Sequence, residues 1–210
     1  MAKQLAKSLG YIYVDSGAMY RSVTLYAMNN GFINDQKVNK EALIQSLSTL
    51  SIEFVFNEQK GFSDIYLNGK DVSDQIRSIE VSNKVSIIAA IPEVRSKLVA
   101  IQQEIGQNKG VVMDGRDIGT VVFPDAELKF FVSCSAQIRA ERRYKELINS
   151  GDQVSFEEVL HNIQSRDQMD TTRAVSPLVQ ADDAVVIDNS NMSPEEQLEL
   201  ILNYAHQKMQ

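Results

Sequence analysis

The sequence predicts an α/β core of parallel strands and helices that is interrupted by an inserted α+β segment. Both ends of the chain alternate short β-prone runs with helix-length segments, whereas a stretch in the middle has the pattern of antiparallel strands. The length of 210 residues suits one large domain or a core with an insertion, and a composition of 43% hydrophobic residues is typical of a globular protein. We expect the core at residues 1–34 and 106–210 and the inserted subdomain at residues 35–105.

The first part of the core reads as a helix, a strand and a second helix. Residues 2–9 have leucines at helical spacing and end in Gly10, which suits a helix C-cap. A β-prone run at residues 11–14 follows, and residues 18–28 then predict a helix that ends before Gly31.

The insert begins with antiparallel strands. Residues 50–73 alternate apolar and polar side chains and contain the pair Asn68-Gly69, which favours a hairpin turn. Pro92 then begins a helix, because proline is favoured at the first helical position, and this helix carries Arg95 in its first turn.

The second part of the core again alternates strands and helices. Its β-prone runs are residues 111–113, 128–132 and 185–187. A helix at about 136–150 follows the second run, and capping boxes at Ser155 and Ser193 begin two more helices, the last of which reaches about Lys208.

Composition excludes several classes of protein. The net charge of -7 argues against broad nucleic-acid binding, and the single Cys134 excludes an internal disulfide framework and a cysteine-based zinc site. No apolar run approaches the roughly 18 residues of a membrane span, and the N-terminus lacks the apolar centre of a signal peptide. We therefore expect a cytoplasmic monomer that binds neither membranes nor nucleic acid.

Three polar segments carry the candidate chemistry. The first, Asp15-Ser16-Gly17-Ala18-Met19-Tyr20-Arg21, joins a strand end to a helix N-terminus, where backbone N–H groups favour an anion. A capped helix with a surface arginine explains this segment equally well.

The second segment, Asp114-Gly115-Arg116-Asp117, directly follows an apolar strand. The carboxyl ends of parallel strands are where α/β sheets bind ligands, so a binding loop is favoured over an ordinary charged loop.

The third segment places Asp170 between Arg166 and Arg173 at helical spacing. Taken alone, this pattern favours a solvated helix face held by ion pairs. The cluster of Arg139, Arg142 and Arg143 likewise reads as an exposed helix face.

Together the arginines of an acidic protein recur at strand ends, as the binding of several phosphates requires. No nucleophilic triad is credible, because His161 and His206 fall on exposed helix faces and Cys134 lies in an apolar run that favours a buried, inert thiol.

Three stretches of the sequence resemble signatures of the bacterial cytidylate kinase family, which belongs to the P-loop nucleoside monophosphate kinases. The matching stretches are residues 15–21, 114–126 and 173–178, and the large central insert separates this family from adenylate kinase. The resemblance implies a sheet of five parallel strands flanked by helices, an insert that closes over the monophosphate, and an arginine-rich helical lid at about 145–175. It also implies transfer of a phosphoryl group from ATP to CMP or dCMP, giving CDP or dCDP, with Mg²⁺ as cofactor.

The resemblance assigns the phosphate and sugar contacts. Arg21 and Arg116 would grip the CMP phosphate, Arg166 and Asp170 would hold the sugar, and Arg166 and Arg173 would converge on the transferring phosphoryl group. In-line transfer needs no nucleophilic side chain, because positioning and charge neutralisation catalyse it.

The resemblance also assigns the base contacts and the metal. Ser86, Arg95 and Asp117 would read cytosine, with Ser16 nearby. No residue is expected to ligate the metal directly, and Asp114 would hold a metal-bound water.

One departure concerns the start of the chain. The family opens with a strand and the motif G-x-x-x-x-G-K-S/T, which cradles the ATP phosphates, and Met1 falls where the residues after that motif begin. We therefore expect roughly 20 residues and the central strand of the sheet to be missing, and the sequence identifies no ATP-binding residues. A CMP-binding protein without catalysis, and a related uridylate or adenylate kinase, stay open as alternatives.

Overall fold

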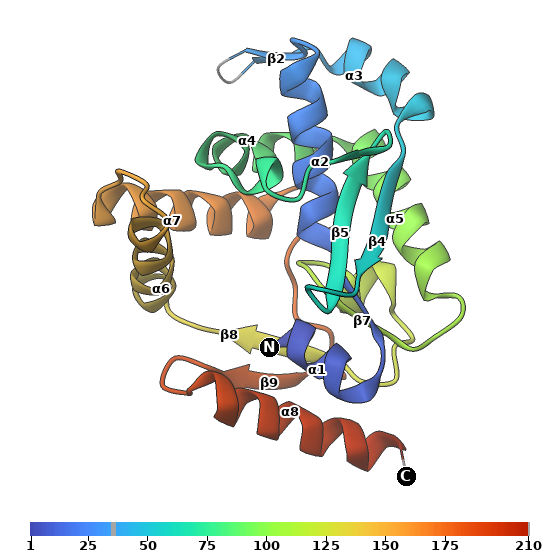
Figure 1. Cartoon of the computed structure of the whole chain (residues 1–210), viewed down its shortest axis with the longest axis vertical. Coiled ribbons are helices and arrows are strands. Elements are labelled where there is room, and N and C mark those ends of the chain that lie inside the picture. The colour runs from blue at the N-terminus through green and yellow to red at the C-terminus, as the bar shows by residue number, and fades with distance from the viewer. Residues whose placement is uncertain (35–36, 210) are drawn as a thin grey trace.

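The computed structural model describes residues 1–34 and 37–209 and shows a mixed α/β protein with helices around short parallel strands (Figure 1). The first residue of the predicted insert, residue 35, lies outside the described residues. Among those described, no helix combines the length and the apolar character that crossing a membrane requires.

The N-terminal part forms the predicted helix, strand and helix. The elements are α1 (Ala2–Leu9), β1 (Ile12–Asp15) and α2 (Ser16–Asn29). Helix α1 ends at Gly10, whose φ of 68° is left-handed and therefore suits glycine. Helix α2 begins two residues earlier than predicted, because the Asp15 carboxylate accepts a hydrogen bond from the Ala18 N–H (2.9 Å) and caps it.

The parallel strands form two separate pairs rather than one continuous sheet. Strand β1 pairs with β7 (Val111–Asp114), and β8 (Phe130–Ser133) pairs with β9 (Val185–Asp188). Within residues 1–34 and 37–209 no backbone ladder joins the two pairs, so the five-stranded parallel sheet that the resemblance implied is not present in this part of the chain.

Side-chain packing joins the two strand pairs instead. One apolar cluster contains Leu5 of α1, Val112 of β7, Phe130 of β8, Ile187 of β9 and Ile201 of α8 (Pro194–Met209). Figure 1 shows α1 and α8 lying close to these strands. Burial of apolar side chains therefore holds these strands and the two helices together.

The middle of the chain contains the predicted antiparallel strands and helices. In order these are β2 (Ile33–Asn34), β3 (Lys37–Val38), α3 (Lys40–Ser46), η1 (Leu47–Thr49), β4 (Ile52–Asn57), β5 (Phe62–Leu67), β6 (Lys70–Asp71), η2 (Gln75–Arg77), α4 (Ile79–Ala89) and α5 (Pro92–Gly106). Strands β4, β5 and β6 form an antiparallel sheet. The largest apolar cluster spans these elements and includes Met19 and Val23 of α2, so α2 is the axis on which the middle segment packs.

Two helices form a hairpin beside this layer. They are α6 (Ala136–Asn149) and α7 (Phe156–Thr172), and the predicted capping box at Ser155 is present at the start of α7. An apolar cluster around Ala140, Leu147 and Val159 holds the hairpin together. Helix α7 runs toward α2 and α4, as Figure 1 shows, and this direction carries its C-terminal end to the strand ends.

The environment of the single cysteine differs from the prediction. Cys134 is partly exposed rather than buried, because β8 ends at Ser133 and the chain turns outward before α6. The Arg142 side chain reaches the Cys134 sulfur at 3.7 Å and the Asn189 carbonyl oxygen at 2.9 Å, which ties α6 to the loop after β9.

Candidate functional site

One pocket collects every residue that the sequence placed in the site. The ten predicted residues that line it are Ser16, Arg21, Ser86, Arg95, Asp114, Arg116, Asp117, Arg166, Asp170 and Arg173. They come from α2, α4, α5, the end of β7 and the loop after it, and the C-terminal half of α7 with the residue that follows it. Residues from Ser16 to Arg173 therefore meet at one place, although their individual roles stay predictions.

The pocket lies at the carboxyl ends of β1 and β7. These strands are in register with Asp15 opposite Asp114, so the start of α2 and the loop after β7 emerge side by side. The Ser16 hydroxyl donates a hydrogen bond to the Asp114 carbonyl oxygen (2.7 Å). A Cβ on Gly115 would lie 2.2 Å from the Ser16 hydroxyl oxygen, so only glycine permits this close approach.

The first turn of α2 holds one pocket arginine in place. The Asp15 carboxylate caps the helix with one oxygen and binds the Arg21 guanidinium with the other (2.7 Å). Gly17 leaves room for this contact, because a Cβ there would lie 3.1 Å from both partners. Arg21 is therefore folded back toward the pocket instead of extending into solvent.

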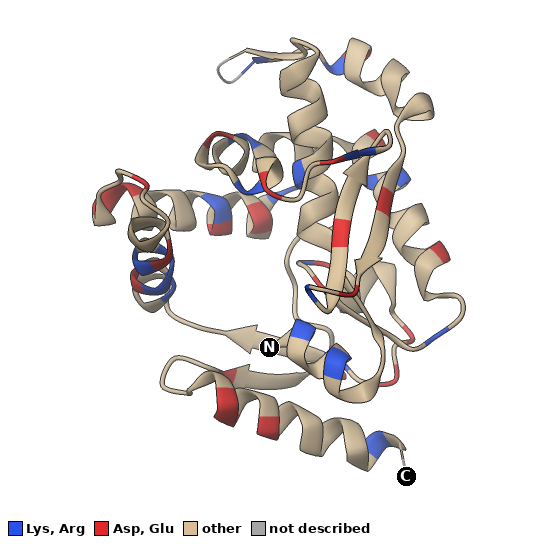
Figure 2. Cartoon of the chain, in the orientation of Figure 1, with Lys and Arg blue, Asp and Glu red and all other residues tan. Residues whose placement is uncertain are grey.

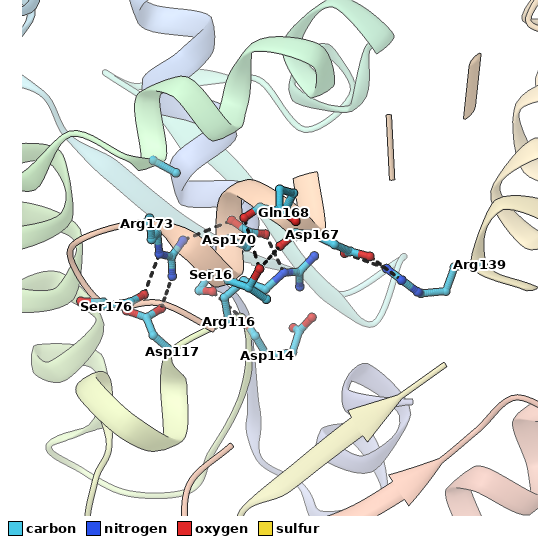
Figure 3. Close-up of polar contacts among 12 residues, drawn as sticks. Ser16, Asp114, Arg116, Asp117, Arg139, Asp167, Gln168, Asp170, Arg173 and Ser176 are labelled. Atoms are coloured by element: carbon cyan, nitrogen blue, oxygen red, sulfur yellow. Dashed lines mark hydrogen bonds and ion pairs between the residues drawn. The ribbon is translucent and has the colours of Figure 1, made fainter. Parts of the chain in front are cut away.

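A chain of alternating charges crosses the pocket floor. The buried side chain of Arg95 donates to the buried carboxylate of Asp117, and Arg173 lies 3.9 Å from the other Asp117 oxygen. Arg173 also donates to Asp170 (3.2 Å), which in turn accepts from Arg116 (3.0 Å). Figure 3 shows Arg173 between Asp117 and Asp170. Buried charges require such partners, because an unpaired charge in a protein interior is strongly destabilising.

These ion pairs show that the third polar segment is not a solvated helix face. A solvated helix face would leave its charges in water, but Asp170 is buried and the Arg173 side chain is only 8% exposed. Beyond α7 the chain turns back, and Arg173 donates to the Ser176 carbonyl oxygen (2.6 Å). These contacts direct both side chains into the pocket.

A further ion pair joins the two helices of the hairpin at its open end. Arg139 of α6 donates two hydrogen bonds, of 3.0 and 2.5 Å, to the Asp167 carboxylate of α7 (Figure 3). Figure 2 shows charges of both signs along α6 and α7. Arg143 pairs with Glu146 on the exposed side, so this arginine has the surface role that the sequence suggested.

Buried polar atoms without partners gather in the pocket. Across residues 1–34 and 37–209, the buried side-chain atoms that lack a hydrogen-bond partner are the Tyr20 hydroxyl, Arg21 Nε, Arg95 Nε, Arg166 Nε and one terminal nitrogen of Arg173. All five residues line this pocket. Four of the atoms are arginine donors, so the pocket offers N–H groups that fit the oxygens of an anion.

Burial shifts the pKa values of several pocket groups. Asp114 lines the pocket and is accessible to water. Desolvation by the surrounding protein, together with the nearby Asp15 carboxylate, raises the pKa of Asp114. Desolvation likewise lowers the pKa of Arg166 and Arg173, with Arg116 and Arg95 as the main cationic neighbours. Arginine nevertheless stays charged, so the pocket presents fixed positive charge at neutral pH.

The sequence reasoning missed some of the lining residues. Asp15 and Tyr20 belong to the first segment, but no role was assigned to them, whereas Val85 and Ala89 of α4 gave no signal. Apolar residues on a helix are ordinarily core residues, and only the packing of α4 beside Ser86 places them at the pocket.

The described part of the chain contains no group of three or more His, Cys, Asp or Glu residues that could hold a metal ion. Asp114 is the pocket carboxylate that stands accessible at a strand end. Mg²⁺ usually keeps several waters and binds through one or two carboxylates and substrate phosphates, so the residues present fit Mg²⁺ held through water.

The fold and the pocket define an α/β protein with an arginine-rich anion site at the carboxyl ends of parallel strands. The family model described as Cytidylate kinase matches residues 1–207 of this sequence, and the chain therefore belongs to the cytidylate kinase family.

Curated relatives agree with this assignment. A cytidylate kinase of Flavobacterium psychrophilum is 57% identical over 203 residues, which make up 97% of this chain and 90% of the relative. Cytidylate kinases of Flavobacterium johnsoniae and Parabacteroides distasonis are 59% identical over 202 residues and 54% identical over 206 residues, covering 96% and 98% of this chain and 88% and 90% of the relatives.

Proposed function

We propose that the protein transfers the terminal phosphoryl group of ATP to CMP or dCMP and so serves pyrimidine nucleotide metabolism. The observation that carries this proposal is the set of unpartnered arginine donors in a pocket at the strand ends. Family membership supplies the reaction class and the donor, and the described residues supply the acceptor pocket.

Arg21 and Arg116 bind the phosphate of CMP in this proposal. Arg21 is held by Asp15 and keeps a buried Nε without an acceptor, and Arg116 is partly exposed at the pocket mouth. Guanidinium groups bind phosphate oxygens in a bidentate way, so two arginines that reach one pocket from α2 and from the loop after β7 suit a dianionic group.

Asp117, Arg95 and Ser86 read the cytosine. Asp117 Oδ2 accepts from Arg95, while Asp117 Oδ1 is 3.9 Å from Arg173 and so keeps capacity to accept another hydrogen bond. The exocyclic amino group of cytosine donates, whereas uracil carries an oxygen at that position. A carboxylate therefore favours cytosine over uracil.

Arg166 and Arg173 neutralise charge on the transferring group, and Asp170 and Arg166 hold the sugar. All three lie on α7 or directly after it, and the lid of this proposal is residues 145–175, which contain the last turn of α6 and all of α7. The segment 35–105 is the subdomain that closes over the monophosphate. Mg²⁺ bound to the nucleotide phosphates would add neutralising charge, with Asp114 holding one of its waters.

The test is direct. The purified protein is titrated with CMP, dCMP, UMP and AMP in a calorimeter, and CDP formation from CMP, ATP and Mg²⁺ is followed by chromatography. We expect CMP and dCMP to bind at least tenfold more tightly than UMP and AMP. Equal affinity for all four nucleotides would contradict the proposed base recognition, and a lack of CDP formation by the purified protein would contradict the proposed reaction.

A further inference from the structure

Tyr20 is a pocket residue without a role in the preceding account. It lies in the first turns of α2 and is buried, with an exposed fraction of 7%. It lines the same pocket as the predicted site residues. Its ring faces the guanidinium of Arg95, whose central carbon is 5.2 Å from the ring centroid. Tyr20 therefore belongs to the base-reading side of the pocket, where Arg95 pairs with Asp117.

The hydroxyl of Tyr20 is the unusual part of this side chain. It is fully buried and has no hydrogen-bond partner among residues 1–34 and 37–209. A buried hydroxyl without a partner is destabilising, and phenylalanine would fill the same space against Arg95 without that penalty. Packing alone therefore does not account for the oxygen.

The other unpartnered buried atoms of the pocket are arginine N–H groups, which only donate hydrogen bonds. The Tyr20 hydroxyl differs from them because it both donates and accepts. Burial raises its pKa to about 12, with Asp117 also raising it while Arg95 and Arg173 lower it, so the phenol stays protonated at neutral pH. The arginine donors suit a phosphate, whereas a group that donates and accepts suits the edge of an aminopyrimidine base.

We propose that the Tyr20 hydroxyl forms a hydrogen bond with the nucleobase of the bound nucleoside monophosphate and is a further specificity residue of this site. The inference rests on the proposed function, because it takes an aminopyrimidine nucleotide as the ligand. The side chain acts in two ways: its ring supports Arg95, and its hydroxyl contacts the base edge beside Asp117.

The test compares Tyr20→Phe with wild type in binding to CMP and to ribose 5-phosphate, which has the same phosphate and sugar but no base. Tyr26→Phe is the matched control, because Tyr26 lies on the same helix, packs against the main apolar cluster and does not line the pocket. We expect Tyr20→Phe to weaken CMP binding about 3- to 10-fold, as the loss of one neutral hydrogen bond does, and to leave ribose 5-phosphate binding unchanged. Tyr26→Phe should change neither affinity.

The melting temperature of the ligand-free protein gives a second readout. Removing an unpartnered buried hydroxyl should leave the melting temperature of Tyr20→Phe equal to or above that of wild type. Unchanged CMP affinity, or an equal loss for CMP and ribose 5-phosphate, would overturn the role of Tyr20. If wild type binds CMP no better than ribose 5-phosphate, the proposed base recognition falls first, and this inference falls with it.

Discussion

At the scale of single residues, the pocket balances its arginines against carboxylates of the same protein. Asp15 holds Arg21 and Asp117 holds Arg95. Asp170 accepts from Arg116 and Arg173. Each carboxylate offsets the charge of a guanidinium and orients it in a partly dry site. The remaining N–H groups stay available, so these ion pairs position the arginines without using up their capacity to bind an anion.

Replacing Arg173 by alanine tests the role of the lid arginines. If Arg173 neutralises charge that develops during transfer, kcat for CDP formation should fall on the order of 10²-fold or more in the variant. Loss of an ordinary surface ion pair changes stability by about 0–1 kcal/mol and does not alter the rate. Arg143→Ala is the control, because Arg143 pairs with Glu146 on the exposed side of α6. Steady-state kinetics with a near-normal kcat for Arg173→Ala would contradict the role in transfer.

Asp117→Asn tests base recognition. Alanine at this position would leave Arg95 as an unpaired buried charge, whereas asparagine keeps the size of the side chain. The amide nitrogen donates, so it suits the uracil oxygen that a carboxylate disfavours. We expect the ratio of CMP to UMP affinity to fall by about tenfold or more in calorimetry. The same ratio in variant and wild type would mean that the base is read by other groups.

Asp114→Asn links the site to stability. The pKa of Asp114 is raised in the folded protein, so its carboxylate disfavours folding wherever it is ionised in both states. The variant should therefore melt at a higher temperature than wild type at pH 7. This difference should shrink as the pH falls through the raised pKa, and it should vanish below the ordinary aspartate pKa, where both states are protonated.

Thermal melts between pH 4 and pH 8 measure this effect. Asp183→Asn is a suitable control, because Lys129 holds the pKa of the exposed Asp183 below its usual value and the expected change has the opposite sign. A melting temperature of Asp114→Asn below that of wild type at pH 7 would contradict the assigned electrostatics.

At the scale of elements, the site depends on the junction between β7 and the start of α2. Ser16 and Gly115 meet there, with a hydrogen bond from the Ser16 hydroxyl to the end of β7. Helix α2 begins on one side of this contact, and the loop that carries Arg116 and Asp117 begins on the other. A small change in their spacing therefore moves both groups of predicted ligands.

Gly115→Ala tests this junction. The new Cβ would lie 2.2 Å from the Ser16 hydroxyl oxygen and 2.8 Å from the Ile118 side chain, so the strand end and the helix must move apart. We expect a loss of about 1–3 kcal/mol of stability and weaker CMP binding. Gly119→Ala is the control, in the short helix Ile118–Val122 that follows. There the atom nearest to the new Cβ is 3.2 Å away, on the flexible Lys129 side chain. Similar melts and affinities for the two variants would contradict the importance of the junction.

Local sequence signals predicted the elements well. The capping boxes at Ser155 and Ser193, the turn at Asn68-Gly69 and the C-cap at Gly10 all occur in the structure. Each depends on hydrogen bonds or backbone angles within a few residues, which the sequence specifies directly. The buried pair of Arg95 and Asp117 depends instead on the packing of two segments, because the two residues are 22 positions apart. Only the resemblance to the kinase family predicted that these residues belong to one site.

At the scale of the whole molecule, the strand order was the least accessible feature. The order of the strands leaves no mark in the sequence of any one of them. The four core strands form two pairs that side-chain packing with α1 and α8 joins. The ten predicted site residues nevertheless converge, because the carboxyl ends of β1 and β7 fix where their loops begin. The partly exposed Cys134 was wrongly predicted as buried for the same reason: its exposure depends on packing after the strand ends.

The contrast between the acidic molecule and its cationic pocket gives a prediction for the whole chain. A net charge of -7 disfavours the approach of anions in general, so phosphate affinity must come from the local arginines. Binding to the folded state alone stabilises it by about 2.7 kcal/mol when the ligand is present at 100 times its Kd. For a chain of this size, the melting temperature should rise by about 5 to 10 °C with CMP at that concentration.

Cytidine at the same concentration is the control for this rise, because it keeps the base and sugar but lacks the phosphate. We expect cytidine to shift the melting temperature by only a small fraction of the CMP effect, and added salt to reduce the CMP shift as it screens the arginines. In Arg21→Met the CMP shift should approach the cytidine shift, since that variant removes a proposed phosphate ligand while leaving Arg95 and Asp117 in place. Equal shifts for cytidine and CMP in wild type would show that the arginines of this pocket do not bind the phosphate, and they would require another ligand for the buried guanidinium donors.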